Sequence, residues 1–184
     1  MIATIVCIVV AIVILAIIIW CIVTSNTFNR MQVKIDEAES DIDVALQKRH
    51  DVLVKMLDVV SGYAKHEVNT FSKVVELRSG MTLPQKQEVQ EQQTATLDRI
   101  NLLAEQYPQL RSSENYQMLQ GSINNVEEHL QAARRLFNGN VSRFNQKLVT
   151  FPASIIGKNI KHLCPRGFFA ADENARADVK TRLP

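Results

Sequence analysis

One uninterrupted apolar segment constrains this chain more than any other feature: the 19 residues from Ile5 to Val23 are all apolar. A helix of about 20 apolar residues is long enough to cross the hydrocarbon core of a bilayer. A cleavable signal peptide would instead need a positively charged start, a shorter apolar core and a cleavage site of small residues. No Lys or Arg precedes the segment, and no Ala-x-Ala pattern ends it. The sequence therefore predicts an uncleaved transmembrane anchor over residues 2–23, in contact with membrane lipid.

The side of the membrane that faces the rest of the chain is predicted from the basic residues beside the anchor. Lys and Arg near the ends of a span are enriched on the cytoplasmic side, whereas Asp and Glu contribute little. Arg30 and Lys34 follow the anchor closely, and no basic side chain precedes it. This small difference favours a cytoplasmic C-terminal domain and leaves a periplasmic one open.

Beyond the anchor, apolar residues recur at steps of three and four, which is the spacing of one face of an α-helix. The pattern predicts long helices at about residues 28–79, 83–107 and 113–149, which form a bundle over residues 28–150. Residues 151–184 are predicted to form a short helix and an irregular tail. Connections of only a few residues make successive helices antiparallel neighbours. The predicted fold class is therefore all-α: an N-terminal transmembrane helix followed by an antiparallel up-and-down bundle of long helices.

Local signals set the predicted helix ends. Gly80 is a C-terminal glycine signal for the first long helix, and Pro108 stops the second. Between them, the segment from Thr82 to Gln85 has the form of a capping box. The polar bridge from residue 24 to residue 27 either continues the anchor into the first long helix or hinges it.

Polar residues and a glycine interrupt these helices. Lys48-Arg49-His50-Asp51 breaks the first apolar stripe, either because the stripe drifts by about 20° per heptad or because a buried polar layer fixes the helix register. Gly62 lies inside the predicted first helix, where it is either tolerated or a point of close helix packing. The glutamine cluster at residues 85–93 is predicted to be a solvated helix face.

The histidines do not form a recognisable metal or catalytic motif. None of His50, His66, His129 and His162 has a carboxylate three residues before it, as di-iron helix bundles require. His66-Glu67 has Thr70 where a zincin motif would place its second histidine. The adjacent pairs His50-Asp51 and Glu128-His129 are not expected to face each other on a helix.

Other classes of function are equally unsupported. Cys7 and Cys21 lie inside the anchor and Cys164 stands alone, so the cysteines suit neither a disulfide framework nor a zinc site. A net charge of +2 gives no argument for a nucleic-acid partner. The sequence predicts no catalytic, cofactor-binding or metal-binding residue, and no enzyme.

The C-terminal segment from Gly157 to Pro184 is basic, with six Lys or Arg and three Asp or Glu. Phe168-Phe169 stands beside Arg166. Basic and aromatic residues together suit contact with anionic lipid headgroups. A solvated, flexible end is the interpretation that the sequence favours.

Several segments resemble the LemA family of bacterial membrane proteins. They begin at Phe28-Asn-Arg-Met and continue at Ile42-Asp-Val-Ala-Leu-Gln-Lys-Arg-His-Asp-Val-Leu and Val60-Ser-Gly-Tyr-Ala-Lys-His-Glu. Further matches are Glu76-Leu-Arg-Ser, Ser113-Glu-Asn-Tyr, Arg143-Phe-Asn, Phe151-Pro152 and Phe168-Phe-Ala, so that the resemblance spans essentially the whole chain. The ending departs from it, because the acidic tail of the family is more basic here.

This resemblance implies one N-terminal transmembrane helix in the bacterial inner membrane and a long-helix bundle, without a known activity or defined ligand residues. Family members often occur near genes for membrane metalloproteases or TPM-domain proteins. We expect a membrane-anchored scaffold that self-associates as a homo-oligomer, because an anchor rich in Ile and Val that continues into a long helix offers an extended contact seam. The alternative is an adaptor or regulatory subunit of a membrane protease or envelope stress system, with a protease or TPM-domain protein as partner.

Overall fold

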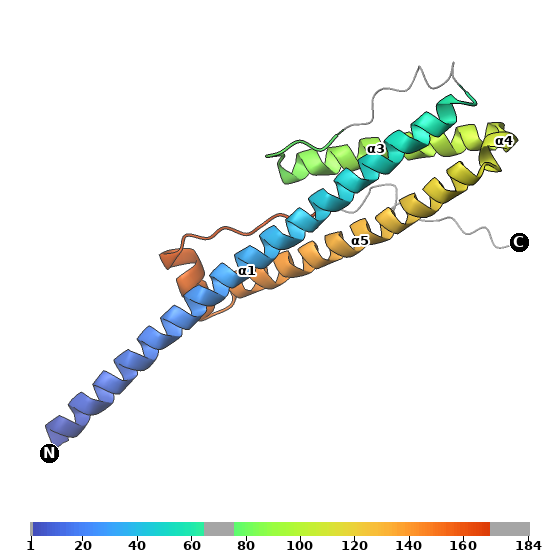
Figure 1. The fold of residues 1–184 in the computed structure, drawn as a ribbon. Coiled ribbons are helices and arrows are strands. Elements are labelled where there is room, and N and C mark those ends of the chain that lie inside the picture. Colours follow the sequence, from blue (N-terminus) through green and yellow to red (C-terminus); the bar gives the residue numbers. More distant parts are fainter. Residues whose placement is uncertain (1, 65–75, 170–184) are drawn as a thin grey trace, which may run out of the picture. The chain divides into compact units, whose positions relative to one another are not determined.

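A computed structural model describes residues 2–64 and 76–169 of the chain (Figure 1). The described residues fold into helices and contain no strand, which confirms the predicted all-α class. The α-helices are α1 (Ile2–Ser61), α3 (Leu83–Gln106), α4 (Pro108–Arg111) and α5 (Glu114–Val149), and a π-helix, η1 (Ile155–Ile160), follows them.

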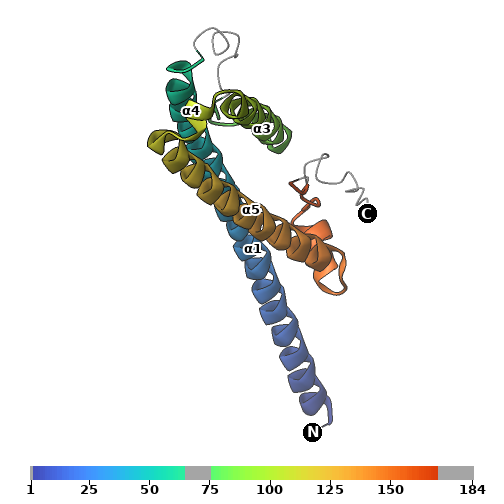
Figure 2. The same cartoon turned by 90° about the vertical axis from the view of Figure 1, so that its right-hand side faces the viewer.

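Helix α1 continues without a break from the apolar segment into the polar part of the chain (Figure 1, Figure 2). The polar bridge at residues 24–27 is helical, and the Thr27 hydroxyl donates a hydrogen bond to the carbonyl of Val23 at 2.8 Å. This bond to the carbonyl four residues back keeps a polar side chain compatible with the helix. Of the two alternatives for this bridge, the structure has the continuous one.

The predicted end of the first long helix at residue 79 is wrong, because α1 ends at Ser61. Gly62 follows directly, and its amide bonds the Val59 carbonyl at 3.2 Å, three residues back, as in the tight last turn of a helix. Gly62 therefore lies after a helix end and not inside a helix. Gly80, the expected cap, is in a turn with φ of 80°. Residues 65–75, with His66 and the sequence positions Glu67, Phe71 and Val74, lie outside the described residues.

The predicted ends of the second and third long helices, 83–107 and 113–149, agree with α3 and α5 to within one residue. At the start of α3, the Thr82 amide donates to Gln85 Oε1 at 2.8 Å, which is the returning half of a capping box. At its end, Pro108 cannot donate a backbone hydrogen bond within a continuing helix. It instead opens the short helix α4.

The described chain divides into two compact units. Of the described residues, the first contains 2–38 and 137–167, and the second contains 39–64, 76–136, 168 and 169. Both long helices contribute to both units, so each unit is described below by its own contacts.

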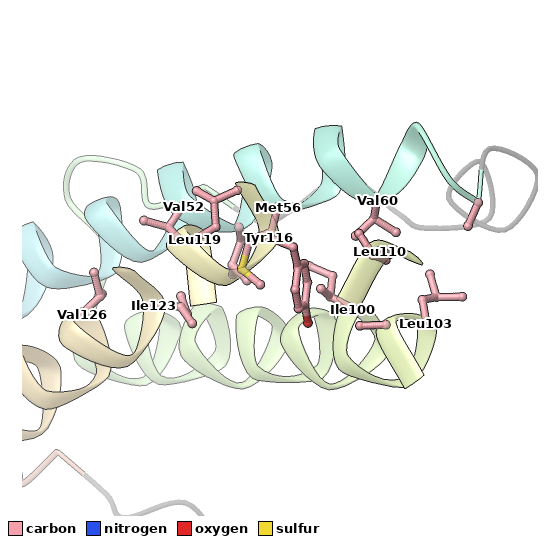
Figure 3. Close-up of a cluster of buried hydrophobic side chains, with 13 residues drawn as sticks. Val52, Met56, Val60, Ile100, Leu103, Leu110, Tyr116, Leu119, Ile123 and Val126 are labelled. Carbon is pink, nitrogen blue, oxygen red and sulfur yellow. The ribbon is translucent and has the colours of Figure 1, made fainter. Parts of the chain in front are cut away.

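The core of the second unit is made by α1, α3, α4 and α5 (Figure 3). Met56 and Val60 from α1 pack in one cluster with Ile100 from α3, Leu110 from α4 and Ile123 from α5. These five side chains are fully buried. Met56, Ile100 and Ile123 are positions of the predicted three-four spacing, whereas Val60 and Leu110 are not.

Within the second unit, α3 runs in the same direction as α1, while α5 runs in the opposite direction. As residue numbers increase along α1, the residue numbers of the contacting partners on α3 also increase. Asp43 contacts Lys86, and Arg49 contacts Gln90. The expected antiparallel arrangement of these two helices is therefore not the one found in this unit.

The core of the first unit is centred on Phe28. Its ring meets the ring of Phe144 edge to face, with centroids 6.0 Å apart and planes at 84°. Leu148 and Gly157 close the other sides: a Cβ built on Gly157 would lie 2.6 Å from Leu148 Cδ1 and 2.9 Å from Phe28 Cζ. Only a glycine allows the π-helix to approach so closely.

Candidate functional site

A buried lysine holds α3 against α1 in the second unit. Lys86, in the first turns of α3, places its Nζ 2.8 Å from Glu39 Oε1 and 2.7 Å from Asp43 Oδ1. The two carboxylates stand four residues apart and so share one face of α1. Burial alone would lower the pKa of Lys86, but its hydrogen bonds and charge interactions with Asp43 and Glu39 outweigh this effect and raise that pKa. The lysine is therefore held as a cation.

Arg49 connects three helices within the same unit. It is 2% exposed. Its Nη1 donates to the Gln90 carbonyl at 3.0 Å and its Nη2 to Thr94 Oγ1 at 3.0 Å, both on α3. Its Nη2 also lies 2.6 Å from Glu127 Oε1 on α5. The planar guanidinium suits this role because it presents several donors in fixed directions.

The structure thus decides between the two interpretations of the Lys48 to Asp51 segment. Arg49 forms a buried polar layer, whereas Lys48 and Asp51 are exposed. His50 Nδ1 lies 3.3 Å from Asp51 Oδ1, so the expectation that these neighbours do not face each other is wrong. The side chains turn toward one another although their Cβ atoms diverge.

The glutamine cluster is only in part a solvated face, which corrects the sequence prediction. Gln93 is completely buried and Gln90 is 8% exposed. The Gln93 side chain donates to the Leu46 carbonyl on α1 at 3.4 Å.

A second polar contact in this unit joins Tyr116 to Asn101 Oδ1 at 3.2 Å, and burial raises the pKa of Tyr116.

A shallow groove of about 400 Å³ lies between α1 and α5 in the second unit. Its apolar lining includes Val44 and Leu136, which are 66% and 52% exposed. Asp41, Lys48 and His129 add polar groups to its lining. A groove lined by apolar side chains together with charged ones is suited to an apolar helix face of a partner.

The histidines are not gathered into one site in the described part of the chain. His50 contacts Asp51, His129 lines the groove, and His162 has φ of 50° in the tail. Among the described residues, no group of three or more His, Cys, Asp or Glu is placed to hold a metal ion. The three cysteines are unpaired thiols, of which Cys7 and Cys164 are exposed.

The sequence interpretation missed Lys86, Gln93 and Glu127 as members of the buried polar layer. A signal for Lys86 was available in Glu39 and Asp43, which place two acidic groups on one helix face beside the apolar stripe. Nothing in the sequence marked Glu127 over the neighbouring Glu128. Which of these two meets Arg49 depends on how α5 is rotated in the bundle.

These features define a class of protein: an all-α bundle held by buried polar contacts, with one N-terminal helix that is long and apolar enough to cross a membrane. The apolar window of that helix has a mean hydropathy of 3.6 and none of it is buried within the chain.

The chain belongs to the LemA family, whose model matches residues 38–182. It is 31% identical to Protein LemA of Metamycoplasma hominis over 161 residues, a match that covers 85% of this chain and 73% of the relative. The family assignment made from the sequence segments is thereby confirmed.

Proposed function

We propose that this LemA-family protein is a membrane-anchored scaffold without chemistry of its own, which presents a helical bundle to other proteins and to further copies of itself. The observation that carries this proposal is the continuity of α1 from Ile2 to Ser61. One helix supplies both the apolar span and residues that hold the bundle together, namely Glu39 and Asp43, which pair with Lys86, and Arg49, which pairs with Glu127.

The groove of the second unit supports an interaction role. Exposed apolar side chains such as Val44 and Leu136, placed together and flanked by polar groups, are typical of protein contact surfaces. A partner that occupies the groove is expected to contribute an apolar helix face. Replacement of either residue by Glu then reduces partner capture.

A pull-down in mild detergent tests the groove. Leu136→Glu is compared with Met118→Glu, which changes an equally exposed apolar residue of α5 that does not line the groove. The proposal expects a stoichiometric partner that is lost only with Leu136→Glu. Equal capture by both variants contradicts it. A membrane protease as that partner favours an adaptor or regulatory role over a general scaffold.

Self-association is tested at the anchor itself. Cys7 and Cys21 are unpaired thiols in the apolar part of α1, so an oxidant applied to native membranes can join two neighbouring anchors. We expect disulfide-linked dimers that disappear when both residues are replaced by Ser. Exclusive recovery of monomer, together with chemical cross-linking that also gives monomer, excludes the homo-oligomer.

For location, we propose a single-pass protein of the bacterial inner membrane with a cytoplasmic bundle. Support comes from Arg30 and Lys34 beside the span. Cys164 is exposed and reports the orientation when cells are treated with an impermeant thiol reagent. Its labelling only after permeabilisation is expected, whereas labelling in intact cells reverses the orientation.

A further inference from the structure

The charge of the chain is divided unequally between its two units. Residues 137–167 contain five Lys or Arg and no Asp or Glu. With residues 1–38, the first unit has seven basic and two acidic residues, which are Asp36 and Glu37. The whole chain has 21 basic and 19 acidic residues, so the second unit has an excess of acidic ones. The net positive charge is therefore found in the unit that also contains the apolar segment.

Helix α5 brings this basic segment back to the end of the anchor. Within the first unit, the Asn140 side chain donates to the Lys34 carbonyl at 2.9 Å, and Phe144 meets Phe28. The two helices are thus antiparallel, and each step along α5 is a step toward the apolar segment. Helix α5 ends at Val149, so by this register the loop that follows lies level with the end of the span near Val23.

The burial of α1 marks the same level. Val23 is 58% exposed, whereas Thr24 is 6% exposed. The cover supplied by the folded part of the first unit therefore begins at the boundary between the apolar segment and the polar bridge. In Figure 1 the orange segment after α5 returns beside the blue part of α1, in agreement with the contact between Gly157 and Phe28.

The loop after α5 and the π-helix that follows it carry large apolar side chains that are exposed. Phe151 is 77% exposed, Ile160 62%, Val149 61% and Ile155 43%. Lys158 stands exposed between two of them on the π-helix. Exposed apolar residues mixed with lysines, at the exit of a membrane span, match the composition of an interfacial membrane-binding surface.

We propose that residues 147–161 form a membrane-docking surface, in which Phe151, Ile155 and Ile160 enter the headgroup region and the exposed Lys158 binds anionic lipid headgroups. Its occupant is the bilayer that surrounds the anchor, because the surface is continuous with the span. Docking fixes the angle at which α1 leaves the membrane. Of the aromatic pair considered from sequence, Phe169 is a poorer choice, since it is 2% exposed and the Arg134 guanidinium lies 5.1 Å from its ring centroid.

This inference rests on the membrane anchorage of the proposed function, and the single tryptophan of the chain separates the two. The full-length protein is reconstituted in nanodiscs of phosphatidylcholine with phosphatidylglycerol, in which part of the lipid carries brominated acyl chains that quench tryptophan. In the wild type, the tryptophan fluorescence comes from Trp20, which lies in the span. Two further proteins carry Trp20→Phe with either Phe151→Trp or Val33→Trp.

Val33 is the matched control, because it is an exposed residue of the same unit. It lies ten residues beyond Val23, or about 15 Å along the helix, beyond the reach of acyl-chain bromine. We expect the tryptophan at residue 151 to be quenched at least about threefold more strongly than the one at residue 33, as shallow insertion requires. Quenching of the two to the same small extent overturns the docking surface.

The lysine part of the proposal has its own readout. Lys158→Glu is expected to reduce quenching at residue 151 in the anionic discs, whereas Lys55→Glu, at an exposed lysine of the second unit, is expected to leave it unchanged. Equal effects of both changes refute the headgroup contact. If Trp20 itself is not quenched in the wild type, the anchor is refuted and the docking surface with it; quenching of Trp20 without quenching at residue 151 refutes only the docking surface.

Discussion

Replacement of Arg49 by Ala tests whether the buried polar layer holds the bundle together. The guanidinium is 2% exposed and bonds the Gln90 carbonyl, Thr94 Oγ1 and Glu127 Oε1 at 3.0, 3.0 and 2.6 Å. Removing one partner of a buried ion pair costs about 3–5 kcal/mol, because the remaining groups stay desolvated without their bonds. Glu127 is 32% exposed, so water relieves part of this penalty and the lower half of the range is expected.

The assay is urea unfolding of the full-length protein in detergent micelles, followed by far-UV circular dichroism. With a dependence on urea of about 1–3 kcal/mol per molar, a loss of about 3 kcal/mol lowers the midpoint by about 1–3 M. This is a large part of the roughly 5–15 kcal/mol by which domains are stable. Lys48→Ala is the control. Lys48 is the exposed neighbour of Arg49, and the loss of its side chain is expected to change stability by less than about 0.5 kcal/mol.

Arg49→Met separates the ion pair from the space that the side chain fills. A methionine replaces much of the buried volume without a charge, and such replacements of buried ion pairs are often neutral or stabilising by about 1–4 kcal/mol when the partner charge is also removed. We therefore expect Arg49→Met with Glu127→Gln to be more stable than Arg49→Ala. A midpoint for Arg49→Ala within the error of the Lys48→Ala control refutes the stabilising role.

Three further changes extend this reasoning. Because folding raises the pKa of Lys86, the stabilisation that this lysine gives is complete below its ordinary pKa of 10.5 and is lost as the pH rises through the higher pKa of the folded state. The difference in urea midpoint between wild type and Lys86→Met is therefore expected to shrink from pH 9 toward pH 12. A constant difference contradicts this. Gly157→Ala places a Cβ 2.6 Å from Leu148 and 2.9 Å from Phe28 and is expected to lower stability by about 1–3 kcal/mol. In contrast, Gly139→Ala, which meets no atom within 4 Å, is expected to be neutral or stabilising by up to about 1 kcal/mol; the opposite order in thermal unfolding refutes the close packing. Gln85→Ala removes the acceptor of the Thr82 amide and is expected to lower the unfolding temperature by an amount equivalent to about 1 kcal/mol, and an unchanged temperature shows that the capping box is not needed.

Most of the local structure could be predicted because its causes are local. The apolar stripe of α5, from Leu119 to Leu148, repeats every three or four residues, and the structure buries each predicted position. Thr82 and Pro108 mark helix boundaries by their own hydrogen-bonding chemistry. The end of α1 was missed because the apolar spacing continues past Gly62. Apolar spacing alone does not indicate that a helix ends at a glycine.

The buried polar contacts could be predicted only in part. The Lys48 to Asp51 segment raised the possibility of a buried layer, but two interpretations fitted the stripe equally well. Lys86 and Gln93 looked like solvated residues because the sequence around them is polar. Their burial depends on α3 lying parallel to α1, with Lys86 against Asp43 and Gln93 against Leu46.

By itself the sequence determined the apolar span, the all-α class and the long helices, because length, hydropathy and helical periodicity act within one segment. Only the tertiary structure decided which polar groups are buried together, where the groove lies, and that residues 147–161 return to the end of the span. These properties depend on helix direction and on rotation about each helix axis. Neither is encoded in the spacing of one segment, since packing between segments sets both.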